Sequence, residues 1–142
     1  MRKPVEIIQG EKPLRLTLYI IVASYLLLVI SIEPAIDFIL LSLFEQKDPY
    51  SIEHLNKLKL ILSALLYSLL AFIPAIFATW FGYRIIASSK LPPVLLSGKT
   101  RFPFTVVVIK GKWAKMFGVL IIVVSLVLIF QVFIYLVNVL FL

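Results

Sequence analysis

Two carboxylates, Glu33 and Asp37, stand four residues apart just after the first long apolar stretch of this 142-residue chain. They share one face of a helix if that helix continues through Pro34, because residues i and i+4 lie one above the other. A carboxylate pair in a membrane can bind a cation or relay protons. Since both residues follow a complete apolar span, the sequence favours a position in the outer interface instead, where the pair would be solvated.

A second group of polar side chains lies near the C-terminus, in an otherwise apolar stretch. Gln131 and Asn138 are seven residues apart with Tyr135 between them, so they form a stripe along one side of a helix. Amides in a membrane usually hydrogen-bond another helix, which contributes about 1 kcal/mol each. The alternative is a path for a substrate or an ion, formed by these amides together with the two carboxylates.

No group of residues in the sequence provides a complete catalytic site. The chain has no cysteine and one histidine, His54, which excludes cysteine-based metal sites and is too few for a histidine-based one. The string SGKT at 97–100 resembles the end of a phosphate-binding loop, but Pro93 occupies the place of the first glycine of that motif. The sequence therefore predicts no enzyme activity of its own, no metal and no cofactor.

Three apolar segments, at 14–32, 58–83 and 116–142, are the elements that must position these residues. At about 1.5 Å per residue, each is long enough to cross a bilayer. With 62% hydrophobic residues and a mean hydropathy of +1.09, the chain is expected to be an all-α integral membrane protein with a single membrane domain over 1–142. A further apolar segment, 35–44, is predicted to be an interfacial helix or a kinked extension of the first helix that leans on a neighbour.

Small residues recur at intervals of three and four along the middle segment. They are Ala64, Ser68, Ala71, Ala75, Ala78 and Gly82. Such a seam lets another helix backbone approach closely, which is the usual basis of helix packing in lipid. The stripe of Thr17, Ser24 and Ser31 on the first segment would suit this seam. Pro74 removes one backbone hydrogen bond and displaces the carbonyl of Leu70, which predicts a kink.

The second connection, 84–115, contains a β-branched and aromatic run at 104–109 that predicts a short strand or extended segment. A single strand is not stable alone, so this one needs the membrane surface, the helix ends or a strand from another chain. The residues expected to contact anionic lipid headgroups or a partner are Lys99, Arg101, Lys110, Lys112 and Trp113. A solvated loop without a ligand is the alternative, and nucleic acid is not an expected partner.

Lysine and arginine are unevenly distributed along the chain. Four lie before the first span or at its start, and seven lie at 84–115. The connection between the first two spans, together with the start of the second span, holds three of them and five of the seven acids. The positive-inside rule therefore predicts a cytoplasmic N-terminus and second connection, and an external C-terminus. The pattern favours a small accessory or assembly subunit of a larger complex in a bacterial-type plasma (inner) membrane, joined by helix–helix packing. A homo-oligomeric transporter or channel is the alternative.

Overall fold

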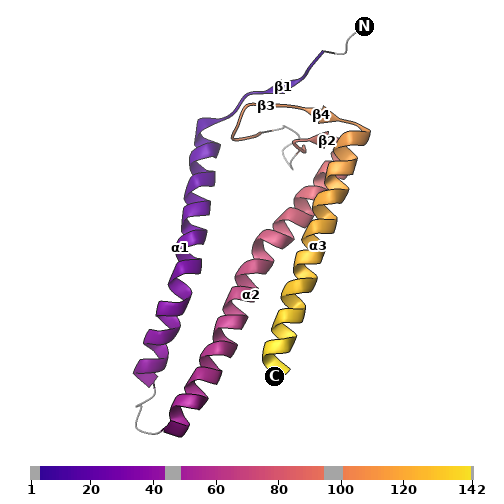
Figure 1. Ribbon diagram of the computed structural model, residues 1–142. Helices are drawn as coiled ribbons and strands as arrows, with labels where there is room; N and C mark the ends of the chain where they lie inside the picture. Colours follow the sequence, from indigo (N-terminus) through magenta and orange to yellow (C-terminus); the bar gives the residue numbers. More distant parts are fainter. Residues whose placement is uncertain (1–3, 44–48, 95–100, 142) are drawn as a thin grey trace.

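The computed structural model describes residues 4–43, 49–94 and 101–141. Three long helices account for most of them: α1 (Lys12–Leu43), α2 (Pro49–Ser88) and α3 (Lys112–Phe141). Each is long and apolar enough to cross a membrane, so the predicted helical fold with three spans is confirmed. In Figure 1, α2 and α3 run side by side, while α1 stands apart from them near the N-terminus and approaches α2 at its other end. We call the end near the N-terminus, where the short strands lie, the strand end. The opposite end, where α1 approaches α2, is called the connection end.

The helices extend beyond the predicted apolar segments. The charges and turn residues at 45–56 predict a short exposed connection, but α2 begins at Pro49, so the described part of this connection is helical and the prediction is wrong there. Proline suits the first position of a helix because its φ is preset and no N–H is needed there. α2 also continues to Ser88, and α3 begins at Lys112, so helix occupies both ends of the predicted second connection.

Pro34 does not end α1, which continues to Leu43. Of the two forms predicted for 35–44, the extension of the first helix is therefore the one observed, with residue 44 outside the described residues. The extension is held by packing: Ile32, Ile36 and Leu40 recur every four residues and form one buried cluster with Leu55 of α2. Proline is tolerated inside a membrane helix where neighbouring groups compensate for the lost backbone bond.

A pair of glycines marks the contact between α2 and α3. A Cβ atom built on Gly82 would lie 2.9 Å from the Gly118 carbonyl oxygen, and one built on Gly118 would lie 2.8 Å from the Gly82 carbonyl oxygen. Both distances are shorter than the 3.4 Å at which ordinary contacts of a Cβ begin. The two backbones therefore approach so closely that glycine is required on both helices. Ile85 and Ala114, which flank this crossing, are fully buried.

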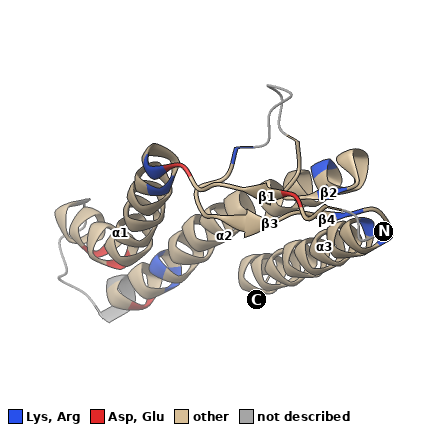
Figure 2. Cartoon of the chain, turned by 90° about the horizontal axis from the view of Figure 1, so that it is seen from above, with Lys and Arg blue, Asp and Glu red and all other residues tan. Residues whose placement is uncertain are grey.

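Four strands of two residues each form two antiparallel pairs at the strand end. β1 (Ile7–Ile8) pairs with β3 (Val106–Val107), and β2 (Lys90–Leu91) pairs with β4 (Ile109–Lys110). A strand is thus present within 104–109 as predicted. Its partner strand comes from the same chain, so a strand from another chain is not needed, while Val106 and Val107 line a pocket with Phe81 near the end of α2, in keeping with the expected support from the helix ends. The N-terminal tail can reach it because both lie at the same end of α1 and α3. Figure 2 shows the tail crossing from α1 above the helix ends.

Candidate functional site

An ion pair between α1 and α2 marks a polar region near the connection end. The continuous helix α1 carries Glu33 and Asp37 on one face, and Lys59 of α2 lies opposite. The Lys59 Nζ is 2.6 Å from Asp37 Oδ1, so Asp37 is paired with a base and not simply solvated. Glu33 lies one turn before Asp37 on the same face of α1.

A pocket of about 290 Å³ opens beside this ion pair, and all three helices line it. The lining residues are Glu33 from α1, Asn56, Lys59, Leu60, Ser63 and Tyr67 from α2, and Tyr135 from α3. A smaller pocket of about 160 Å³ shares Asn56 and Lys59 with it and includes Asp37. Both signs of charge, an amide and three hydroxyl groups thus border a common space. Such a site suits a small polar group that itself carries both charges.

The structure brings together only part of the predicted polar path. Glu33 lines the larger pocket and Asp37 the smaller one, whereas Gln131 and Asn138 line neither and are exposed on α3. The two amides share a helix face with Tyr135, which does line the larger pocket. The amide stripe therefore flanks the pocket.

The contribution of α2 to this site was missed from the sequence. Asn56, Lys59, Ser63 and Tyr67 follow one another at intervals of three, four and four residues, which is the signal of a single polar helix face. Three of the four residues, Lys59, Ser63 and Tyr67, lie in the segment 58–83 that the sequence predicts to be helical, and only Asn56 lies before it. The face was missed because this segment was interpreted through its small residues, and the spacing of its polar residues was not followed.

A hydrogen bond in the middle of the apolar spans joins α1 to α2. Tyr25 Oη donates to the Leu70 carbonyl oxygen over 2.7 Å. This carbonyl is the one that Pro74, four residues further on, has no N–H to pair with. The tyrosine hydroxyl therefore satisfies a backbone acceptor that would otherwise be unpaired in apolar surroundings. The position of Pro74 in the sequence identifies the displaced carbonyl but not its donor, because spacing within α1 does not specify which of its faces meets Pro74.

The predicted small-residue seam of α2 lies mostly in the interior. Buried members are Ala64, Ser68, Ala75 and Gly82, while Ala71 and Ala78 are half-buried. The predicted match with Thr17, Ser24 and Ser31 of α1 is wrong, because these three residues are exposed. The hydroxyls of Thr17 and Ser31 donate to carbonyls of their own helix. Gly82 packs against Gly118 of α3, where the absence of a side chain on both helices permits the close approach.

Acidic residues of the N-terminal tail pair with bases of the second connection. Arg101 Nε and Nη2 donate to the two carboxylate oxygens of Glu11, over 3.0 and 2.7 Å. Glu6 forms ion pairs with Lys110 and, at 4.0 Å, with Lys90. The hydrogen bond from Arg101 lowers the pKa of the Glu11 carboxyl, and the hydrogen bond from Lys110 lowers the pKa of the Glu6 carboxyl. The tail is therefore held by charge as well as by strand pairing.

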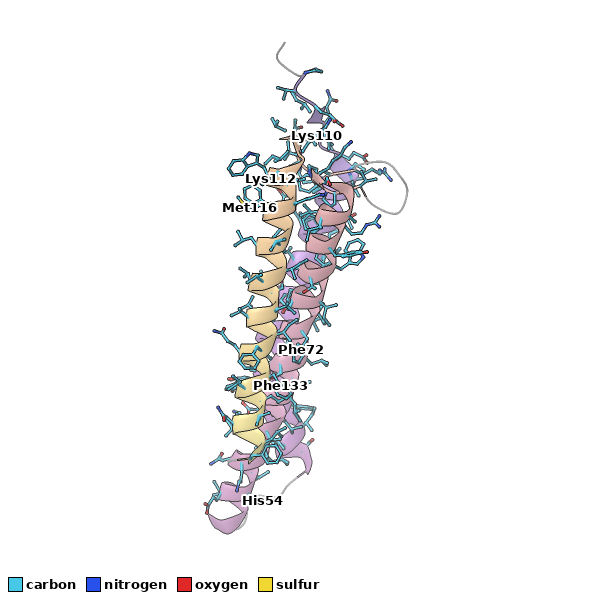
Figure 3. All side chains as sticks on the ribbon, turned by 90° about the vertical axis from the view of Figure 1, so that its right-hand side faces the viewer. His54, Phe72, Lys110, Lys112, Met116 and Phe133 are labelled. Atoms are coloured by element: carbon cyan, nitrogen blue, oxygen red, sulfur yellow. The ribbon has the colours of Figure 1, made fainter. Side chains whose placement is uncertain are left out.

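Two of the five residues predicted to contact lipid or a partner are thus engaged within the chain, namely Arg101 and Lys110. The number of bases along the second connection does not reveal that two of them pair with acids of the tail. Lys112 and Trp113 open α3, and Trp113 is 66% exposed. Figure 3 shows Lys110 and Lys112 at the strand end, the end predicted to be cytoplasmic. Lys99 lies outside the described residues.

The tail also fixes the start of α1 to the second connection. The Gly10 N–H donates to Thr105 Oγ1 over 3.0 Å, and Arg15 Nε donates to the Pro103 carbonyl oxygen over 3.2 Å. The Arg15 guanidinium lies 5.3 Å from the centre of the Phe104 ring, within range of a cation–π contact. A Cβ atom at Gly10 would lie 2.8 Å from backbone atoms of the second connection. Glycine is therefore needed where the two segments cross.

Comparisons with known proteins assign none of these features. No protein-family model, curated protein or solved structure matches the chain significantly. What the site does must be inferred from its own residues.

Proposed function

We propose that this chain is a small accessory or assembly subunit of a larger membrane protein complex, which it joins through helix–helix packing. The observation that carries this is the exposure of Gln131 and Asn138 on α3, within the segment expected to cross the membrane. Hydrogen bonds of polar side chains between membrane helices contribute about 0.6 kcal/mol on average and up to about 1.7 kcal/mol. A partner helix lying along this stripe would pair both amides.

The attachment of α1 supports a role in assembly. Within the described residues, α1 meets α2 through Tyr25, through the Asp37–Lys59 ion pair and through the Ile32 cluster. Most of the remaining surface of α1 is exposed and apolar. Lipid tails are as apolar as leucine side chains, so such a surface is stable in contact with lipid. A partner can pack against it, but its apolar character does not by itself drive association. Gln131 is different, because it lies roughly 24 Å along α3 from Lys115, inside a hydrocarbon core of about 30 Å, where lipid tails offer its amide no hydrogen bond. Asn138, at roughly 35 Å, lies at the headgroup level on the same face.

The contact partners we propose are other transmembrane helices and the headgroups of the bilayer, in a bacterial-type inner membrane with the strand end in the cytoplasm. Lys12, Lys112 and Lys115 stand at the strand ends of α1 and α3, and each well-placed base contributes about 1 kcal/mol toward anionic lipid. Arg101 and Lys110 contribute less, since acids of the same chain already neutralise them. A nucleic-acid partner is not proposed.

Single cysteines test the orientation, because the chain has none of its own. Val107→Cys at the strand end should resist a membrane-impermeant thiol reagent in intact cells, whereas Ile52→Cys near the start of α2 should react. Both native side chains are exposed, and both thiols should react once the cells are permeabilised. Labelling of Val107→Cys alone in intact cells would reverse the assignment.

The subunit role is tested by removing the amides. The double variant Gln131→Leu, Asn138→Leu should still insert but should lose its partner chains during extraction in mild detergent. Phe130→Leu with Phe133→Leu is the matched control, because it changes two exposed side chains of the same helix without removing a hydrogen-bonding group. The readout is the native mass of the extracted assembly, with its subunits identified. Retention of the same assembly by the amide variant would exclude this stripe as the contact surface.

A homo-oligomeric transporter or channel is the second candidate, favoured by the pocket beside Glu33 and Lys59. A homo-oligomer would give multiples of 16.2 kDa in the same native mass measurement. In reconstituted vesicles, Glu33→Gln or Asp37→Asn would then abolish an ion- or proton-dependent flux. That pair of results would replace the subunit proposal.

A further inference from the structure

We infer that the pocket lined by Glu33, Lys59, Tyr67 and Tyr135 binds the phosphoethanolamine headgroup of a phospholipid. All three helices contribute to this pocket, and its volume of about 290 Å³ provides room for a small zwitterionic group. Both signs of charge stand at its wall, which matches a ligand with a phosphate and an ammonium group a few bonds apart. Such a site would operate with or without a partner subunit.

The depth of the pocket in the bilayer supports a headgroup as its ligand. Glu33 follows the apolar segment 14–32, which covers roughly 28 Å of helix. Tyr135 lies twenty residues beyond Lys115, or roughly 30 Å from the bases of the strand end. Lys59 is the second residue of the apolar segment 58–83. The hydrocarbon core of a bilayer is about 30 Å thick, so all three helices independently place the pocket at the opposite headgroup level.

The charges in the pocket are arranged for a zwitterion. Asp37 pairs with Lys59 at 2.6 Å, whereas Glu33 forms no ion pair with any other residue that the structure describes. Glu33 is therefore available as the counterion of a ligand ammonium group. Lys59 carries three N–H donors and uses one on Asp37, so it can also donate to phosphate oxygens, as can the amide of Asn56.

The two tyrosines favour an ammonium group over an uncharged alcohol. Tyr67 and Tyr135 border the same pocket as Glu33, and the faces of aromatic rings attract cations. A primary ammonium can in addition donate up to three hydrogen bonds to Glu33 and the hydroxyl groups. The quaternary ammonium of choline has no N–H to donate, and a glycerol headgroup has no cation. Ethanolamine should therefore bind best, choline less well and glycerol least.

Lipid preference is measured with the purified full-length protein in detergent micelles. Phosphatidylethanolamine, phosphatidylcholine and phosphatidylglycerol with identical acyl chains are titrated separately, and bound lipids are counted by native mass spectrometry. We expect the ethanolamine lipid to bind at least about tenfold more tightly than the other two, as one charge-assisted hydrogen bond would produce. Equal binding of the three lipids, or preference for the glycerol lipid, would overturn the assignment. This comparison uses the wild-type protein, so its result does not depend on whether a substituted protein folds.

Charge variants locate the binding in the pocket. Glu33→Gln and Lys59→Gln should each weaken binding of the ethanolamine lipid by about tenfold. Glu53→Gln and Lys57→Gln are matched controls, because these residues are exposed on α2 at the same end and do not line the pocket. Unchanged binding by the Glu33 variant would show that the lipid sits elsewhere. Soluble phosphoethanolamine should compete only weakly with the lipid, since it lacks the acyl chains that hold the ligand at the interface. Competition as strong as that of the lipid would assign the site to a free amine phosphate instead.

Discussion

Removing one hydroxyl group, in Tyr25→Phe, tests how α1 is attached to α2. The ring stays and only the 2.7 Å hydrogen bond to the Leu70 carbonyl oxygen is lost. In a regular helix the N–H of residue 74 would donate to this carbonyl, but Pro74 has no N–H. Without the tyrosine hydroxyl, the Leu70 carbonyl therefore loses its hydrogen-bond donor. An unpaired buried polar group costs roughly 1–3 kcal/mol in soluble proteins, while side-chain hydrogen bonds in membranes average about 0.6 and reach about 1.7 kcal/mol. We expect Tyr25→Phe to lower the free energy of unfolding by about 1 kcal/mol.

Pro74→Ala shows whether the proline is the reason for this cost. Alanine restores the N–H that the Leu70 carbonyl lacks, so in this background the tyrosine hydroxyl becomes dispensable and Tyr25→Phe should cost only a few tenths of a kcal/mol. The wild type, two single variants and the double variant form a double-mutant cycle with an expected coupling of about 0.5–1.5 kcal/mol. The free energy of unfolding is measured by reversible denaturation in detergent micelles, followed by far-ultraviolet circular dichroism.

Two results would refute this reasoning. An equal cost of Tyr25→Phe in both backgrounds would show that the hydroxyl acts independently of the carbonyl that Pro74 leaves unpaired. No cost in either background would show that α1 is not held at this level. Its attachment would then rest on the Ile32 cluster, the Asp37–Lys59 ion pair and the N-terminal tail.

Two further predictions concern the crossing of α2 with α3 and the N-terminal tail. Gly118→Ala should lower the free energy of unfolding by about 1–3 kcal/mol, because the new Cβ would lie 2.8 Å from the Gly82 carbonyl oxygen. Val119→Ile at the neighbouring exposed position should change it little in the same assay, and equal effects would mean that the helices separate without cost. Arg101 lowers the pKa of Glu11, so the stabilisation from this pair is complete above the ordinary value of 4.5 and is lost as the pH falls through the lowered value. Protection of the Glu11 backbone N–H from hydrogen exchange should fall over that pH range, and Glu11→Gln should abolish the pH dependence.

The three helices could be predicted because length and hydropathy are properties of the local sequence. Their ends could not, since these depend on contacts across the fold. Pro34 marks a helix boundary by local rules, yet α1 continues through it because Ile36 and Leu40 pack with Leu55 of another helix. Likewise the strand at Val106–Val107 was readable from its residue types, whereas its pairing with Ile7–Ile8 depends on segments about 100 residues apart meeting at one end of the molecule.

The candidate site was predictable only where its residues lie on one helix. The spacing of Glu33 and Asp37 places them on a common face, but the base opposite them depends on the rotation and height of α2 relative to α1. No spacing rule within a single segment provides that information. For the same reason, counting bases in the second connection did not reveal that Glu6 neutralises Lys110.

The contacts of α1 show which interactions can position a helix in lipid, where burying apolar side chains gives no net attraction. It is attached at three levels: by Gly10 and Arg15 at the strand end, by Tyr25 in the middle, and by the Ile32 cluster with the Asp37 ion pair at the connection end. Most of these attachments are directional polar bonds, which remain favourable in lipid because the alternative is an unpaired group. α2 and α3 instead meet through glycine and alanine, by close packing of backbones. Loss of a single polar bond should therefore loosen α1 while leaving the α2–α3 pair intact, so the Tyr25→Phe and Gly118→Ala variants should destabilise different parts of the same chain.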